Sequence, residues 1–251
     1  MRAFSTPSTL RSCRVIAGAF VMALSSAATW PGPAVGSSGV PLHRVAHADL
    51  CVTNGLVSAL PGDRLAVNSA SSRAVAPGST GTSAFIRFRY LGPSADSKPL
   101  ASGEVRRQIG LKLRASDTCN LVYVMWHIQP DAQVSVSIKR NPGRHSHAAC
   151  HAGGYTRLKA TSRVDLPRIN PGEQHTLRAE LQPDRIEVFA DERPVWTGSL
   201  MGTVIDFDGP AGFRTDNARF EIEYLVAART GAQGPSTMIS TPNHCADEPA
   251  D

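Results

Sequence analysis

The densest group of chemically capable side chains in this 251-residue sequence lies between residues 139 and 151. Three of the eight histidines and three basic side chains fall in this short segment, whose Pro and Gly residues are typical of a loop. Lys, Arg, Asn and His side chains donate hydrogen bonds to hydroxyls and carboxylates, and aromatic rings pack on apolar faces. We therefore predict a ligand site formed by Lys139, Arg140, Asn141, Arg144, His145, His147, Trp126 and Tyr155.

Each part of this predicted site has an alternative. His145 and His147 belong to a residue type that ligates zinc or copper, although we expect no bound metal or cofactor. A Gly- and His-containing loop that ends at Cys150 is also typical of a solvated, disulfide-braced connection. Trp126 lies in the nearly continuous apolar run LVYVMWHI, which favours a place in the core. Loops on a rigid scaffold are where binding side chains concentrate, so we expect any ligand site to use this loop.

The cysteines indicate how the loop is held. Cys13 lies in the first 48 residues, ahead of their apolar run. The other four form an even number, as expected in an oxidising compartment, and are Cys51, Cys119, Cys150 and Cys245. Of the three possible pairings we predict Cys119–Cys150 and Cys51–Cys245. The alternative is metal ligation by Cys119 and Cys150 with nearby histidines, which is disfavoured because neither belongs to a CxxC pair.

Residues 1–48 have the pattern of a removable leader. Their charged residues are Arg2, Arg11, Arg14 and Arg44, with no Asp or Glu. Residues 15–24 are an uncharged run of the length of a signal-peptide core, too short to span a bilayer. A small-residue cleavage pattern occurs at residues 46–48. Cleavage near residues 26–28 and an uncleaved anchor are the alternatives. Because no later segment is apolar enough to cross a membrane, we expect a secreted, extracellular or periplasmic protein.

The charge of the remaining chain excludes one class of partner. The whole sequence has 26 Lys and Arg against 21 Asp and Glu, and four of the arginines lie in the predicted leader. The rest of the chain is therefore close to neutral. A nucleic-acid binder needs a basic surface to neutralise phosphates, so we predict no nucleic-acid partner.

Alternating apolar and polar residues predict an all-β domain over residues 49–228. Period-2 alternation predicts half-buried strands, and a continuous apolar run predicts a strand buried on both sides. The predicted strands cover residues 85–90, 105–114, 121–128, 134–139, 155–160, 175–181, 185–189 and 218–226, with another beginning at 195. Pro130–Ala132 supplies a hairpin turn between two of them. Short strands at this spacing are typical of a sandwich or barrel. Residues 229–251 have the composition of a polar tail.

Part of this pattern resembles a known superfamily. Residues 173–181 (EQHTLRAEL), 184–191 (DRIEVFAD) and 194–196 (PVW) resemble a hairpin of the concanavalin A-like lectin/glucanase superfamily, which includes laminin-G-like modules and laminarinase-like hydrolases. Residues 209–214 and 217–221 resemble its penultimate strand pair. The resemblance implies a two-sheet antiparallel jelly-roll sandwich, here braced by disulfides. Glu192 stands where the superfamily usually has a turn glycine, which leaves the turn type open.

The catalytic motifs of that superfamily are missing. Laminarinase-like hydrolases carry an E-x-D-x-x-E run, because two carboxylates must flank one glycosidic bond. The strand predicted at 121–128, which would carry that run by position, has no carboxylate. Glu221 and Glu223 are two residues apart on one strand, and we interpret them as a solvated outer face. Alginate-lyase-type relatives need a Gln-x-His strand that is missing here, and Tyr155 is only a faint trace of their Lys-x-Gly-x-Tyr strand.

These observations favour a secreted, non-catalytic protein that recognises a polysaccharide or cell-envelope glycan. The alternatives are a glycan-active hydrolase or polysaccharide lyase with an unrecognised site, and a structural envelope protein. Superfamily membership by itself does not decide among them, because one fold hosts many functions.

Overall fold

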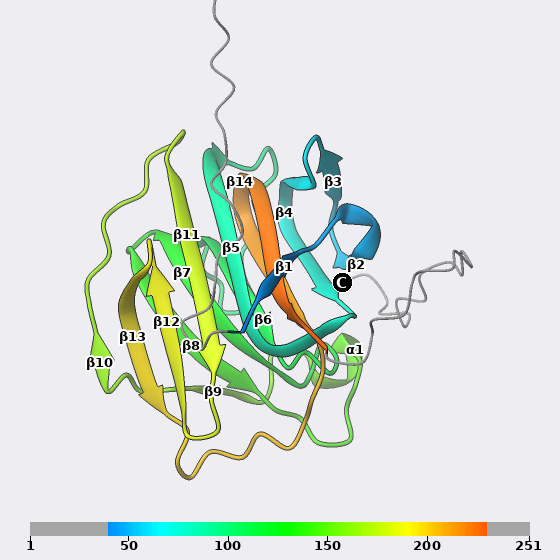
Figure 1. Cartoon of the computed structure of the whole chain (residues 1–251), viewed down its shortest axis with the longest axis vertical. Coiled ribbons are helices and arrows are strands. Elements are labelled where there is room, and N and C mark those ends of the chain that lie inside the picture. Colours follow the sequence, from blue (N-terminus) through cyan, green and yellow to red (C-terminus); the bar gives the residue numbers. More distant parts are fainter. Residues whose placement is uncertain (1–39, 230–251) are drawn as a thin grey trace, which may run out of the picture. The chain divides into compact units, whose positions relative to one another are not determined.

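β-Strands make up almost all the regular structure in residues 40–229, the part of the chain that this computed structural model describes (Figure 1). The strands are β1 (Leu42–Arg44), β2 (Cys51–Asn54), β3 (Val57–Leu60), β4 (Arg64–Ala76), β5 (Ser79–Pro93), β6 (Arg107–Leu113), β7 (Leu121–Gln129), β8 (Gln133–Lys139), β9 (Tyr155–Arg157), β10 (Ser162–Arg163), β11 (Gln174–Leu181), β12 (Arg185–Ala190), β13 (Arg193–Ser199) and β14 (Ala211–Ala228). Within these residues the helical elements are a 3-10 turn, η1 (His47–Asp49), and one short helix, α1 (His147–Cys150).

The antiparallel strands form two layers because β14 passes from one to the other. Residues 211–216 of β14 pair with β6 and with residues 71–76 of β4. Residues 218–228 pair instead with β5, with β1 and with the first half of β4. The path runs β10-β13-β12-β11-β5-β14-β6-β7-β8-β9, while β2 and β3 pair with β4. Figure 1 shows β11, β12 and β13 in front of the more distant β7 and β8.

Asn217 lies where β14 changes partners. Its backbone is in the left-handed region, with φ of 53°, a conformation that Asn tolerates better than most residues. The side chain is buried and accepts a hydrogen bond from the backbone N–H of Lys98 at 2.8 Å. It also donates to the carbonyls of Lys98 (2.9 Å) and Arg106 (3.1 Å). The bend is therefore held by bonds to the β5–β6 connection.

Apolar side chains from both layers meet in one core. Phe88 of β5 makes edge-to-face contacts with Trp126 of β7 and Phe220 of β14, each with ring centroids 5.6 Å apart. All three are fully buried. Contacts of this geometry add about 0.5–1.5 kcal/mol per pair beyond the area they bury. The period-2 pattern thus places alternate side chains between the layers, and the predicted all-β sandwich is confirmed.

The long strand β4 was not predicted from the sequence. Its inward positions near the C-terminal end carry Ala70, Ser72, Ala74 and Ala76, all buried. Small and polar residues of this kind give no apolar alternation, because burial here rests on close backbone approach and not on large side chains. The short strands β2 and β3, which pair with β4, were missed with it.

The turn between β12 and β13 resolves the question raised by Glu192. Asp191 and Glu192 both have positive φ, 49° and 61°, as the central residues of a type I′ hairpin turn require. Asp191 stabilises the turn, because its carboxylate accepts a hydrogen bond from the backbone N–H of Thr176 at 2.9 Å and lies 2.9 Å from Nδ1 of His175. The hairpin therefore forms without the usual glycine.

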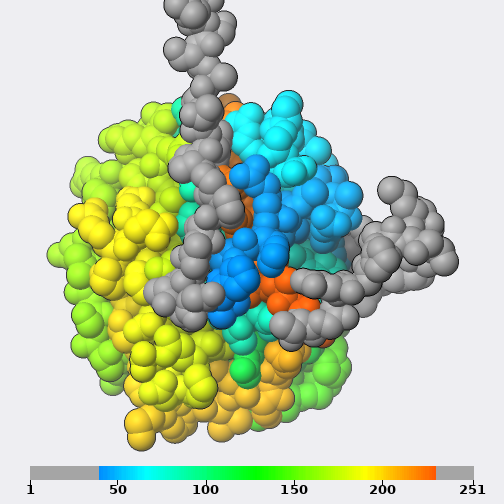
Figure 2. Space-filling view, viewed as in Figure 1, coloured from blue at the N-terminus to red at the C-terminus, as the bar shows by residue number. Residues whose placement is uncertain are grey.

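Residues 42–44, which the sequence analysis placed in the leader, form β1 and pair with residues 225–227 of β14. Leu42 is buried against Phe85, Leu225 and Ala227, and Val45 lies in the main core. Figure 2 shows this blue segment beside the orange end of the described chain. Cleavage after residue 48 would remove β1, whereas cleavage near residues 26–28 would keep it.

The remaining terminal predictions fall on residues 1–39 and 230–251, which lie outside the described residues. Cys51 is buried and disulfide-bonded, but Cys245 is among the residues not described, so the Cys51–Cys245 pairing stays a prediction. Within residues 40–229, no helix has both the length and the apolar character needed to cross a membrane.

Candidate functional site

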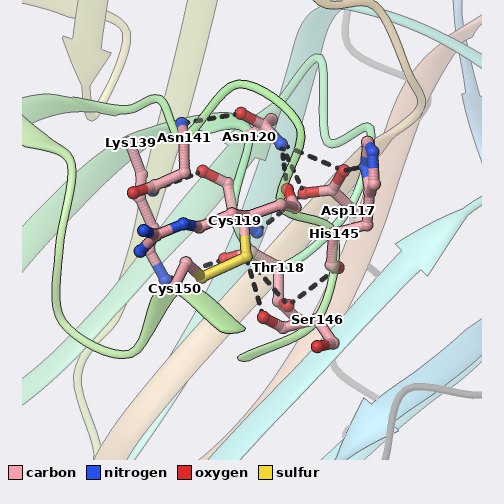
Figure 3. Close-up of polar contacts among 10 residues, drawn as sticks. Asp117, Thr118, Cys119, Asn120, Lys139, Asn141, His145, Ser146 and Cys150 are labelled. Carbon is pink, nitrogen blue, oxygen red and sulfur yellow. Dashed lines mark hydrogen bonds and ion pairs between the residues drawn. A yellow bond between two sulfur atoms is a disulfide. The ribbon is translucent and has the colours of Figure 1, made fainter. Parts of the chain in front are cut away.

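The predicted Cys119–Cys150 disulfide is present, with its Cα atoms 5.9 Å apart. It ties the loop after β8 to the segment before β7, and both cysteines are buried. Asp117 accepts hydrogen bonds from the backbone N–H of Cys119 at 2.7 Å and from the Asn120 amide at 3.0 Å. The Asn141 amide donates to the Cys119 carbonyl at 3.1 Å. Figure 3 shows the bond inside this network, which fixes the loop that we predicted as a ligand site.

Several of the predicted ligand side chains hold that loop in place. Arg140 makes two hydrogen bonds to the carboxylate of Asp206, at 2.8 and 2.6 Å. Nδ1 of His145 lies 2.7 Å from an Asp117 oxygen, as Figure 3 shows. Arg144 donates to a backbone carbonyl within the loop at 3.2 Å. These groups are engaged with the protein and brace the loop, and none of the three lines the cleft beside it.

A cleft of about 540 Å³ opens beside the loop, on the outer face of the layer that contains β6 to β9. Arg214 and Asp216 point away from the core because they alternate with the buried Phe213 and Thr215 along β14. Residues from the loop and from the strands form the wall together, among them Arg73, Arg214, Asp216, His147, His151 and Tyr155.

Two stacked tyrosines form one side of this cleft. Tyr155 is 45% exposed, and its ring lies over that of Tyr123 of β7, with centroids 6.2 Å apart and an interplanar angle of 20°. The Lys139 ammonium lies 5.3 Å from the Tyr155 ring centroid and donates to the carbonyl of Thr118 at 2.9 Å. Burial, together with the charge of Tyr123, raises the pKa of Tyr155 to about 12, so its hydroxyl is protonated at neutral pH.

An ion pair fixes the cation at the floor of the cleft. Arg214 donates to both oxygens of Asp216, at 2.8 and 3.1 Å. Asp216 also accepts hydrogen bonds from the Gln108 amide at 2.6 Å and from the Ser71 hydroxyl at 3.2 Å. Burial by itself would lower the pKa of Arg214, but the Asp216 carboxylate raises it above its ordinary value. Arg214 is therefore a fixed, permanently charged donor.

The buried Tyr123 indicates the sign of the potential in this region. Burial favours the neutral phenol and would raise the pKa of Tyr123. The pKa is nevertheless lowered, because the positive charges of Arg214, Lys112, Arg73 and Lys139 outweigh burial. Positive potential therefore dominates under the cleft.

His127 lies further along the same face of β7. It is buried, and its Nε2 is 2.7 Å from the Ser135 hydroxyl. Burial, and then the charges of Arg106 and Arg157, lower the pKa of His127 to about 3. The imidazole is consequently neutral at neutral pH.

Glu221 and Glu223 do not line the cleft, and both form ion pairs with arginines. Glu221 pairs with Arg64 at 3.2 Å, and Glu223 pairs with Arg44 and Arg87. Glu223 is 1% exposed, so the interpretation of this pair as a solvated face is wrong for Glu223. The two arginines around it compensate its burial, as a buried carboxylate requires.

The structure brings together only part of the predicted site. Tyr155 and His147 line the cleft, Lys139 is buried beneath the Tyr155 ring, and Trp126 is a core residue with no exposed surface. His147 lies beside His151, with ring centroids 6.2 Å apart. Among residues 40–229 no group of three or more His, Cys, Asp or Glu side chains is arranged to hold a metal ion.

Among the cleft residues that the sequence analysis missed are Arg73, Arg214, Asp216 and His151. Arg73 comes from β4, whose sequence gave no strand signal. Arg214 and Asp216 flank a buried position in the segment that carries the superfamily resemblance, and this alternation was the available signal that they face outward.

Comparisons with known proteins give the fold independently. No protein-family model and no curated protein sequence matches the chain. Among solved structures, the carbohydrate-binding module CBM66 from Bacillus subtilis matches with a TM-score of 0.50 and 15% identity, over 72% of this chain and 96% of the module. An endo-1,3-beta-glucanase (laminarinase) catalytic domain from Thermotoga petrophila RKU-1 matches at 0.39 and 13%, over 66% and 77%.

The Caenorhabditis elegans galectin LEC-6 matches with a TM-score of 0.36 and 10% identity, over 72% of this chain and 98% of the galectin. At these sequence identities the similarity concerns the fold alone, and the inference of the fold rests on the carbohydrate-binding module. The chain has a jelly-roll β-sandwich fold.

Proposed function

We propose that this protein is exported and binds a polysaccharide or cell-envelope glycan in the cleft beside the disulfide-braced loop, with a sugar ring packed on Tyr155. The observation that carries the proposal is the exposed Tyr155 ring, held flat by Tyr123 in the wall of a cleft of about 540 Å³. A rigid aromatic ring with polar neighbours suits a sugar, which has apolar faces and hydroxyl edges.

The fold and the lining support this proposal. A carbohydrate-binding module shares the β-sandwich architecture, which makes the same class of ligand a reasonable expectation. Asn54, Ser69 and Ser71 add amide and hydroxyl groups to the wall, and these can exchange hydrogen bonds with sugar hydroxyls. The buried disulfide and the sequence of residues 1–48 support export, because disulfides persist in oxidising compartments.

Binding without turnover is the function that the lining favours. Hydrolysis of a glycosidic bond requires two carboxylates free to act as acid and as nucleophile or base. The wall holds two carboxylates, the exposed Asp96 and the buried Asp216, and Asp216 is not free because it already accepts four hydrogen bonds from Arg214, Gln108 and Ser71. The hydrogen bonds of Asp216 indicate that this carboxylate positions the Arg214 guanidinium.

A glycan array on the full chain, followed by titration of each hit, tests the proposal. Tyr155→Ala should weaken binding about tenfold, the equivalent of about 1.4 kcal/mol. Tyr155→Phe keeps the ring and should bind within about twofold of the wild type, as should Met201→Ala, a control on an exposed side chain outside the cleft. Product analysis accompanies each hit. If Tyr155→Ala binds as tightly as the wild type, or if no glycan on the array binds, the proposed site is wrong. If the product analysis detects turnover of a glycan, the function is enzymatic.

A further inference from the structure

The cleft carries an excess of positive charge. Among the described residues in its wall the cations are Arg73, Lys98 and Arg214, and the carboxylates are Asp96 and Asp216. Outside this wall, the buried Lys112 and Lys139 add positive charge that acts on Tyr123. A neutral sugar gains nothing from such an excess, whereas a cleft lined by one sign of charge attracts ligands of the opposite sign.

Three cations face two carboxylates in this wall, the exposed Asp96 and the buried Asp216. Asp216 is 1% exposed and its oxygens are occupied by Arg214, Gln108 and Ser71, so it presents little negative charge to a ligand. Its structural effect is to orient the Arg214 guanidinium. Arg214 is also held over the Tyr123 ring, with its central carbon 5.3 Å from the centroid. A guanidinium fixed on two sides loses little rotamer entropy when it binds an anion.

The potential inside the protein supports the same sign. Tyr123 is buried, which favours its neutral form, and yet four surrounding cations lower its pKa. The anionic phenolate would be stabilised at this position. The same stabilisation is available to a ligand's carboxylate or sulfate above the stacked tyrosines.

We propose that the cleft selects an anionic polysaccharide, with a sugar carboxylate or sulfate on Arg73 and Arg214 and the adjoining sugar ring on Tyr155. The proposal rests on the function proposed above and adds the chemical class of the glycan. Arg and Tyr are well matched to this task, because a guanidinium donates charge-assisted hydrogen bonds to anion oxygens while the ring covers the apolar face of the sugar.

Affinity measurements with four polymers test the proposal: polygalacturonate and alginate as carboxylated chains, dextran sulfate as a sulfated chain, and dextran as a neutral chain. The wild type should bind at least one anionic polymer at least tenfold more tightly than dextran, and added salt should weaken that binding. Carboxylated and sulfated polymers both satisfy the proposal, and their relative affinities identify the recognised group.

Arg73→Gln should weaken binding of the anionic polymer at least tenfold. The matched control is Arg185→Gln on β12, a similar loss of charge outside the cleft, which should change the affinity less than twofold. Lys98→Gln supplies a second cleft variant if Arg73→Gln alters the circular dichroism spectrum. Equal losses from the cleft and control variants would mean unspecific charge attraction and would overturn the proposal.

The outcomes also separate the two proposals. Equal affinity for dextran and the anionic polymers, still reduced by Tyr155→Ala, refutes the selection of anions and leaves glycan binding intact. Binding of no polymer, together with an empty glycan array, refutes both. Tight binding of an anionic polymer that is lost in both Tyr155→Ala and Arg73→Gln supports both.

Discussion

Removing the Cys119–Cys150 bond should destabilise the fold by an amount that follows from the length of chain it closes. The cysteines are 31 residues apart in sequence. In the chain-entropy model, a loop of this length corresponds to about 3.7 kcal/mol at 25 °C, because the cross-link removes conformations from the unfolded chain. The variant is Cys119→Ala/Cys150→Ala, which leaves no free thiol at either position. For a domain whose total stability is about 5–15 kcal/mol, this is a large fraction.

The assay is urea unfolding followed by the fluorescence of the buried Trp126 and Trp196. Thr118→Ala is the matched control, because Thr118 lies next to the bond without forming it, and we expect a loss below about 1 kcal/mol. The double variant should also bind its glycan more weakly, since His147 and Tyr155 stand on the chain that the bond restrains. A loss of stability no larger than that of the control would refute the entropic reasoning.

The other two predictions concern acidity and the mature N-terminus. Because burial lowers the pKa of His127 to about 3, the unfolded chain binds a proton there between about pH 6.5 and 3 that the folded protein does not. As the pH decreases across that window, this group should lower the free energy of unfolding by about 1.4 kcal/mol per pH unit. His127→Gln should therefore flatten the dependence of the urea midpoint on pH. Parallel curves of midpoint against pH for the wild type and the variant would contradict this reasoning. N-terminal sequencing of the exported protein should show that the mature chain begins before Leu42. A chain that starts at Asp49 should be less stable by about 2–5 kcal/mol than one that starts at Val40, because Leu42 and Val45 are buried. Equal stabilities of the two chains would make β1 dispensable.

The strands that the sequence predicted share one property, which is large apolar side chains at alternate positions. The run at 121–128 and the alternation at 134–139 became β7 and β8, and their inward residues lie in the core. β4 has the same alternation of burial, but beyond Leu65 and Val67 its inward side chains are Ala and Ser. Periodicity in hydropathy cannot find such a strand, because the contrast between its two faces is too small.

The candidate site was predicted only where it is local in sequence. Tyr155 and His147 belong to the loop that composition singled out, and both line the cleft. Arg73 and Arg214 reach the same cleft from strands that pair only in the folded sheet, with Arg73 directly opposite Arg214 in the register of β4 and β14. Their proximity depends on the register between β4 and β14. That register could not be predicted from the sequence, because β4 itself was not predicted.

The position of β14 has a consequence for how the domain is made. The last described strand pairs with β1, β4, β5 and β6, so four strands from the first part of the described chain share it as a neighbour. Until residues 211–228 have emerged, each of those four strands lacks one of its neighbours. Non-local pairing of this kind makes folding slow and leaves early chains open to aggregation. The export proposed above would deliver β14 after its four partners, so that the sandwich would close on this strand only after transport.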